Sequence, residues 1–123
     1  MANAKNPKYD LEERTAKFGA ECIIFAKKIS VNKITERMIP QLVAAGTSIG
    51  ANYGEADDAE SGRDFVHKIG ICKKEARESK HWLRMVAVAV PELTAEARQL
   101  WKEANELNLI FNAISRKIKN KSK

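Results

Sequence analysis

Apolar residues recur every three or four positions along four separate segments of this chain, and this spacing constrains the fold more than any other feature. Such steps place side chains on one face of an α-helix, whereas a strand would require alternation. The sequence therefore predicts amphipathic helices and no strands. The longest run comprises Phe65, Ile69, Cys72, Ala76, Ser79, Leu83, Val86 and Val90. The other three comprise Phe18, Cys22, Phe25 and Ile29; Ile39, Leu42, Gly46, Ile49, Tyr53 and Ala56; and Ala97, Leu100, Ala104, Leu107, Phe111, Ile114 and Ile118.

Local sequence features divide the chain into four helices joined by short turns. Ser61 and Asp64 form a capping-box pair that predicts the start of the third helix, and Pro91 ends it. Short turns between long helices favour an all-α fold, an antiparallel up-down-up-down four-helix bundle. The predicted organisation is an N-terminal arm over residues 1–10, a bundle over 11–118 with helices at about 11–30, 35–59, 62–90 and 95–118, and a basic tail over 119–123.

The composition is that of a small globular domain. The chain has 123 residues, of which 44% are hydrophobic and 31% charged. No run approaches the roughly 18 apolar residues of a membrane span, so we expect a cytoplasmic protein without a membrane partner. Cys22 and Cys72 lie inside apolar runs without a CxxC or Cys/His grouping, which predicts two buried thiols.

A polar row occupies one face of the second predicted helix, within the stretch TSIGANYGEADDAESGRDF. Ser48, Asn52 and Glu55 are spaced four and then three residues apart. If buried, these groups need hydrogen bonds, which Lys68, Arg63 or a neighbouring backbone can supply. Either the row locks this helix against the third helix or a second subunit, or it lines a groove for a ligand or RNA. Small residues among them let another helix approach closely: Gly46, Gly50, Ala51 and Gly54.

The candidate catalytic and metal-binding motifs are weak. Glu78 and His81 form a Glu-x-x-His motif, and Asp64 and His67 form an analogous pair. Both lie on the third helix, roughly 21 Å apart, so they cannot form the facing pair that a carboxylate di-iron bundle requires. No other predicted helix contains histidine, and no glycine-rich phosphate loop is present. The sequence therefore predicts no metal, no cofactor and no enzymatic activity.

Basic residues follow the apolar seam of the third helix. Lys73, Arg77, Lys80 and Arg84 are spaced i, i+4, i+7 and i+11, and so share one face. They form a solvated flank, or they pair with Glu75, Glu78 and carboxylates of the next helix, or they bind phosphates. The formal net charge is +6, and the C-terminal end supplies five of these charges, which leaves +1 for the body. These five residues are Arg116, Lys117, Lys119, Lys121 and Lys123.

The stretch TSIGANYGEADDAES, followed by DFVHKIGICKKEARESKHWLR, resembles the 23S rRNA intervening-sequence protein family. The resemblance is carried by S-I-G-A-N, E-A, D-F, K-E-A and W-L in this order and spacing. It implies that the polar residues in and around these motifs form a hydrogen-bonded network or a subunit interface. The residues concerned are Ser48, Asn52, Glu55, Arg63, Asp64, Lys68, Glu75 and Trp82.

This resemblance further implies a small bacterial four-helix bundle that assembles as a homopentamer around a central channel. The family has no established enzymatic activity. Related members include accessory proteins that partner reverse transcriptases and bind nucleic acid. We therefore expect a non-enzymatic, self-assembling protein that binds RNA or another nucleic acid through the basic residues of the third helix and the C-terminal end. The alternative is a protein-interaction scaffold, such as an accessory subunit of a reverse transcriptase.

Overall fold

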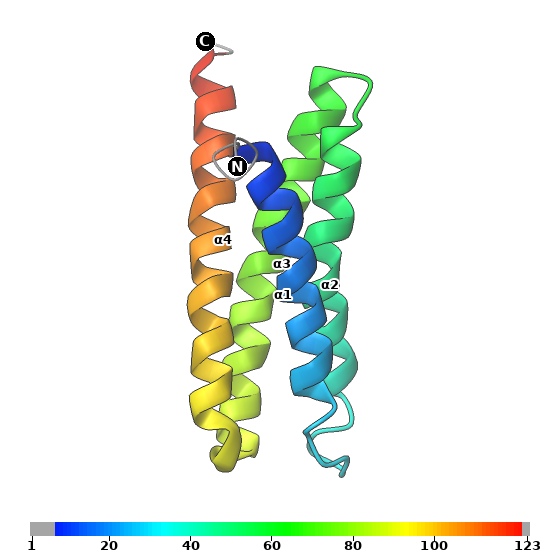
Figure 1. Cartoon of the computed structure of the whole chain (residues 1–123), viewed down its shortest axis with the longest axis vertical. Coiled ribbons are helices and arrows are strands. Elements are labelled where there is room, and N and C mark those ends of the chain that lie inside the picture. Colours follow the sequence, from blue (N-terminus) through cyan, green and yellow to red (C-terminus); the bar gives the residue numbers. More distant parts are fainter. Residues whose placement is uncertain (1–6, 122–123) are drawn as a thin grey trace.

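The computed structural model describes residues 7–121, which form an up-and-down bundle of four helices (Figure 1). This architecture confirms the predicted fold class. A single 3₁₀ turn, η2, joins the last two helices. The elements are α1 (Pro7–Ala26), α2 (Met38–Asp57), α3 (Gly62–Ala89), η2 (Pro91–Leu93) and α4 (Thr94–Lys121). The predicted arm and tail fall partly in helices, because α1 begins at Pro7 and α4 continues to Lys121; residues 1–6 and 122–123 lie outside the described part.

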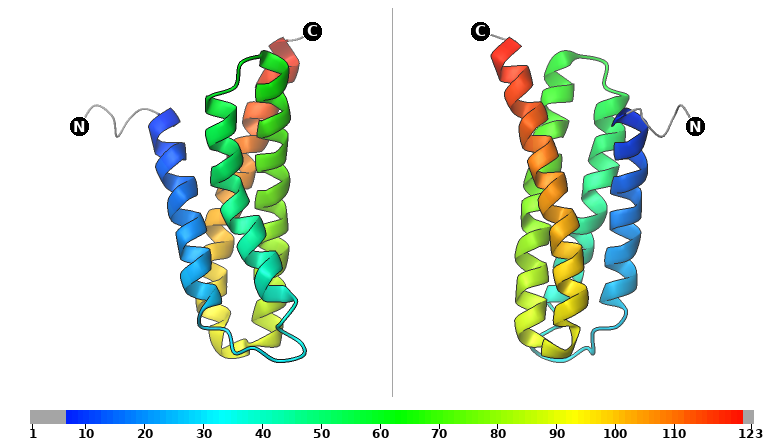
Figure 2. Two further views of the ribbon diagram at one scale, coloured as in Figure 1. Left: turned by 90° about the vertical axis from the view of Figure 1, so that its right-hand side faces the viewer. Right: turned by 60° about the vertical axis from the view of Figure 1, so that its left-hand side comes forward.

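Helix α3 is the central element of the bundle. It packs along its length against α2 on one side and α4 on the other. Helix α1 packs against α2 and meets α4 over a much smaller contact. Both views of Figure 2 show the N-terminal half of α1 lying away from α4. The α1–α4 seam is therefore the loosest of the four.

The connection between α1 and α2 is longer than predicted. Thr35 is buried, and its hydroxyl donates to the Ser30 carbonyl at 2.6 Å. The Asn32 side-chain oxygen accepts from the backbone N–H groups of Ile34 and Thr35, both at 2.9 Å. These side chains offer the backbone an alternative to helical hydrogen bonds. Consequently α1 ends at Ala26 and α2 begins at Met38, whereas the sequence had predicted helix through Ser30 and again from Thr35.

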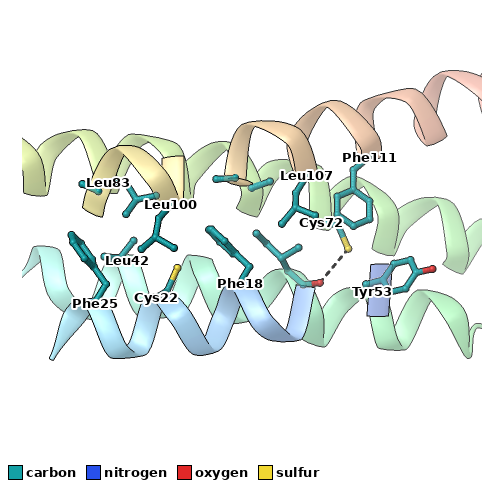
Figure 3. Close-up of a cluster of buried hydrophobic side chains, with 14 of the residues drawn as sticks. Phe18, Cys22, Phe25, Leu42, Tyr53, Cys72, Leu83, Leu100, Leu107 and Phe111 are labelled. Carbon is teal, nitrogen blue, oxygen red and sulfur yellow. Dashed lines mark hydrogen bonds between the residues drawn. The ribbon is translucent and has the colours of Figure 1, made fainter. Parts of the chain in front are cut away.

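The start of α3 follows the sequence pattern. The Ser61 hydroxyl accepts from the backbone N–H of Asp64 at 3.1 Å, as a capping residue should. The predicted seams also form the core (Figure 3). The largest fully buried apolar side chains come from all four helices: Phe18, Leu42, Ile49, Ile69, Leu83, Val86, Leu107 and Phe111.

Small residues bring α1 and α2 into close contact. A Cβ at Gly46 would lie 2.6 Å from the Cys22 sulfur, and a Cβ at Gly50 would lie 3.4 Å from the backbone of Thr15. A Cβ at Gly54 would meet nothing within 4 Å. The close approach that the sequence suggested therefore involves Gly46 and Gly50, and the partner helix is α1.

Both cysteines are inert components of this packing. Cys22 and Cys72 are fully buried free thiols, and the Cys72 sulfur donates to the Ile49 carbonyl at 3.5 Å (Figure 3). Burial raises the pKa of each thiol to about 12. At neutral pH the two groups are therefore protonated and poor nucleophiles.

We expect Gly46→Ala to lower the free energy of unfolding by about 1–3 kcal/mol, because the added methyl overlaps the Cys22 side chain in a packed core. Gly54→Ala adds the same methyl to open space on the same helix, and should leave stability unchanged or raise it by up to about 1 kcal/mol. Urea unfolding followed by circular dichroism measures both variants. Equal destabilisation of the two would contradict the close packing of α1 on α2 at Gly46.

Candidate nucleic-acid interface

In the polar row of α2, Asn52 bonds within its own helix and Glu55 pairs with α3. Ser48 and Asn52 are half-buried, and the Asn52 amide donates to the Ser48 carbonyl at 2.9 Å. Glu55 is exposed and forms an ion pair with Lys68 of α3 at 2.7 Å. Arg63, the other predicted partner, is exposed and forms no ion pair with any residue from 7 to 121. Of the partners considered, Lys68 is the one that the fold places against the row.

The remaining motif residues are spread along α3. Asp64 is exposed in the first turn and contributes its backbone N–H to the Ser61 cap. Glu75 is half-buried, and this burial, with the nearby Glu78 carboxylate, raises the pKa of the Glu75 carboxyl. Trp82 packs against the core and meets the His81 ring edge-on, with centroids 4.9 Å apart.

Among the predicted cations of α3, Lys80 is held by its neighbours. Its ammonium donates to the side-chain oxygens of Asn105 at 3.0 Å and Asn108 at 3.4 Å. It also lies over the Trp101 ring, 5.4 Å from the centroid. The Asn108 amide in turn donates to the Lys73 carbonyl at 2.9 Å. Lys80 therefore connects α3 to α4 through neutral partners, without a carboxylate.

The other cations of this stripe have free head groups. Arg77 and Arg84 are exposed and Lys73 is half-buried. Within residues 7–121, none of the three forms an ion pair. The interpretation in which the stripe is neutralised by neighbouring carboxylates is therefore not what the structure shows. Phosphate binding would not first require these cations to leave an ion pair.

Helix α4 carries its ion-paired carboxylates on the side that faces α1. Its carboxylates Glu103 and Glu106 accept from Arg14 of α1 at 2.7 and 2.9 Å, and Arg14 contacts Glu103 through two nitrogens. Glu96 pairs at 2.5 Å with Lys28, which lies two residues beyond the C-terminal end of α1. These ion pairs bridge the loose α1–α4 seam, so that this side of α4 carries the paired acids.

A groove opens on the opposite side of α4, between it and the last turns of α3. Its volume is about 470 Å³. Three of its lining residues are cations and none is a carboxylate. The groove is lined by Leu83, Arg84 and Ala87 of α3 and by Thr94, Ala97, Arg98, Trp101 and Lys102 of α4.

Two of these cations were not among the site residues predicted from the sequence. Arg98 and Lys102 are exposed, and neither forms an ion pair within the described part of the chain. They are four residues apart on α4, a spacing that already places both on one face. Their proximity to Arg84 depends on the alignment of α3 with α4, which the sequence pattern did not specify.

The basic end of α4 remains helical beyond the predicted boundary. Arg116, Lys117 and Lys119 are exposed on its last turns, and the helix extends to Lys121. This end lies at the same end of the bundle as the turn between α2 and α3, where Asp57, Asp58 and Glu60 are exposed (Figure 1). The predicted cation at position 123 lies outside the described residues.

The described residues contain neither a metal-type cluster nor a membrane-spanning helix. Between positions 7 and 121, no three His, Cys, Asp or Glu side chains converge as a metal site would require. None of the helices described combines the length and apolar character of a membrane span. The α1–α4 seam contains a groove of about 390 Å³, but charges of both signs line it.

These features define a small antiparallel helical bundle with a groove between α3 and α4 that three cations line. A sequence profile of the 23S rRNA-intervening sequence protein family matches residues 9–123, and the chain belongs to this family. The resemblance noted from the motifs of α2 and α3 is thereby confirmed. No curated protein matches the chain.

A solved relative shares the fold. It is the crystal structure of a protein of unknown function from the S23 ribosomal protein family of Bacteroides thetaiotaomicron VPI-5482. The two structures align with a TM-score of 0.76 at 24% sequence identity, over 89% of this chain and 97% of that chain. At this identity the similarity shows the fold alone.

The contacts of Lys80 predict that the stripe contains one structural cation. Lys80→Gln should lower the free energy of unfolding by about 1 kcal/mol, because it removes the ammonium that binds the two asparagines and lies over Trp101. Arg77→Gln, on the same helix and exposed, should change stability by less than about 0.5 kcal/mol. Chemical denaturation of both variants measures these changes in stability. A larger destabilisation by Arg77→Gln than by Lys80→Gln would contradict the structural role of Lys80.

Proposed function

We propose that this protein is a non-enzymatic RNA-binding protein, whose RNA runs along the α3–α4 side of the bundle. The observation that carries the proposal is the set of exposed cations from both helices that have no carboxylate partner within residues 7–121. Arg77 and Arg84 belong to α3, and Arg98 and Lys102 to α4. Phosphate groups bind such cations and release counterions from the nucleic acid.

The placement of the acids supports the same surface. Glu103 and Glu106 pair with Arg14 of α1, and Glu96 pairs with Lys28, just after α1. These carboxylates therefore reduce the positive potential of the α3–α4 side less than randomly placed carboxylates would. The exposed cations Arg116, Lys117 and Lys119 extend the basic character to the end of α4. Arginine and lysine contacts of this type would position the RNA backbone without specifying its sequence.

The proposed assembly is a homopentamer, as the family resemblance implies. Several large apolar side chains are exposed in the isolated bundle, and subunit contacts would remove them from water. They are Ile23, Ile24, Val31, Ile34, Val66, Val88 and Leu109. A ring of bundles would also present several α3–α4 grooves to one RNA, which increases the apparent affinity without new kinds of contact.

RNA binding is expected to depend steeply on salt. If four phosphates are neutralised, the logarithm of the association constant should fall with the logarithm of salt concentration at a slope of about −3 to −4. Arg77→Gln combined with Arg84→Gln should reduce the magnitude of this slope by about 1.4–1.8. Fluorescence anisotropy of a labelled single-stranded RNA measures both quantities.

The matched control for this experiment is Lys17→Gln. Lys17 is also an exposed cation without an ion pair within residues 7–121, but it lies on α1, which packs against α2 and α4 and not against α3. It should leave the slope unchanged. Absence of RNA binding at low salt, or binding indifferent to salt, would contradict the proposal and favour the protein scaffold.

The assembly is tested by native mass spectrometry of protein purified at low salt. The chain has a mass of 13.8 kDa, so a homopentamer would have a mass of about 69 kDa. We expect this species, with additional RNA mass when nuclease is omitted. A monomer across the micromolar range would contradict the proposed assembly.

A further inference from the structure

We infer that the α3–α4 groove binds one nucleotide of a single-stranded RNA, with the base inside the groove and the flanking phosphates on its three cations. This inference rests on the RNA-binding function proposed above and names the site and the strandedness of its ligand. It concerns the hollow between Leu83 and Trp101, whereas the more distant cations Lys73 and Arg77 would contact the backbone outside it.

The floor of the groove is apolar and suits the face of a base. Leu83 and Ala97 are almost fully buried beneath it, at 1% and 2% exposure. Ala87 and Trp101 are half-buried and line it as well. A volume of about 470 Å³ is within the range of sites that hold small molecules, roughly 300–1,000 Å³. The groove is therefore large enough for a nucleobase with its ribose.

The cations stand on both helices that border this floor. Arg84 comes from α3, and Arg98 and Lys102 come from α4. No carboxylate lines the groove, and none of these three cations is paired within residues 7–121. A ligand that combines an apolar ring with negative charge on either side matches this arrangement. A single-stranded nucleic acid has this composition, since each base is flanked by two phosphates.

Trp101 is positioned before any ligand binds. Lys80 lies over its ring at 5.4 Å, and Lys80 is itself fixed by Asn105 and Asn108. A ring held in this way loses little side-chain entropy when a base contacts it. The contacts of Lys80 thus serve the groove indirectly, by positioning Trp101.

This arrangement selects single strands over duplexes. In a duplex, the bases are paired and stacked, so a groove of this kind would reach only their edges unless a base were extruded. An acidic peptide would satisfy the cations but would bring no aromatic face for the apolar floor. Single-stranded RNA, duplex RNA and an acidic peptide would therefore interact with this groove in different ways.

The test uses the intrinsic fluorescence of Trp101. The chain has two tryptophans, so Trp82→Phe leaves Trp101 as the sole reporter and retains an aromatic ring against the core. We expect a uridylate dodecamer to quench this emission in a saturable manner at 50 mM salt. An RNA duplex of the same length should bind more weakly and leave the emission unchanged. Circular dichroism confirms that each variant is folded.

Substitutions in the same background locate the site. Arg98→Gln and Lys102→Gln should each weaken uridylate binding by about eightfold at 50 mM salt, since each removes one phosphate contact. The control Lys17→Gln, on α1, should change it less than twofold. In the chain that retains Trp82, Trp101→Leu should weaken the binding of labelled uridylate by about tenfold, while Trp101→Phe should retain most of it.

The outcomes separate this inference from the function on which it rests. If uridylate binds with the predicted salt dependence but Trp101 emission and the α4 substitutions are without effect, the groove is excluded and RNA binding elsewhere on the bundle stands. Equal quenching by the duplex, or by a glutamate dodecamer, also overturns the groove inference. Failure of all RNAs to bind overturns both proposals.

Discussion

Burial of the apolar stripe of α3 between α2 and α4 is the interaction on which the rest of this structure depends. Leu83 and Val86 at one end and Ile69 at the other are almost completely removed from water. Because this stripe is buried along the whole helix, the polar flanks of α3 are fixed as well, and Lys80 and Arg84 must lie beside α4. The candidate site is thus a consequence of the core packing, and it needs no separate loop or insertion.

The second constraint is the distribution of charge on α4. Helix α1 meets α4 over a small contact, and Arg14 and Lys28 compensate by bridging this seam to its carboxylates. Exposed ion pairs such as Lys28–Glu96 contribute little to stability, typically less than about 1 kcal/mol each. The half-buried Arg14–Glu103 pair is held by two hydrogen bonds. The larger effect of these ion pairs is on the surface potential, since they leave the α3 side of α4 to Arg98 and Lys102. The same pairs that close the bundle therefore create the basic groove.

Much of the fold could be predicted from the sequence, because heptad spacing fixes which side chains face inward. The ends of the helices could be predicted less well. The Asn32–Thr35 hydrogen bonds replaced a predicted helical turn, and no periodic pattern reports such local competition. For the small residues of α2, the sequence indicated close packing without its partner, which the structure identifies as α1 through Gly46 and Cys22.

Only the α3 part of the candidate site could be predicted from the sequence. Arg77 and Arg84 stood out because regular spacing on one helix can be counted, whereas the proximity of Arg84 to Arg98 and Lys102 depends on how two helices are aligned. The most direct test of this account is photocrosslinking of a 4-thiouridine-containing RNA, with the attached peptide identified by mass spectrometry. Crosslinks to Trp101 and its neighbours on α3 and α4 are predicted. Crosslinks confined to α1 or α2 would contradict the account.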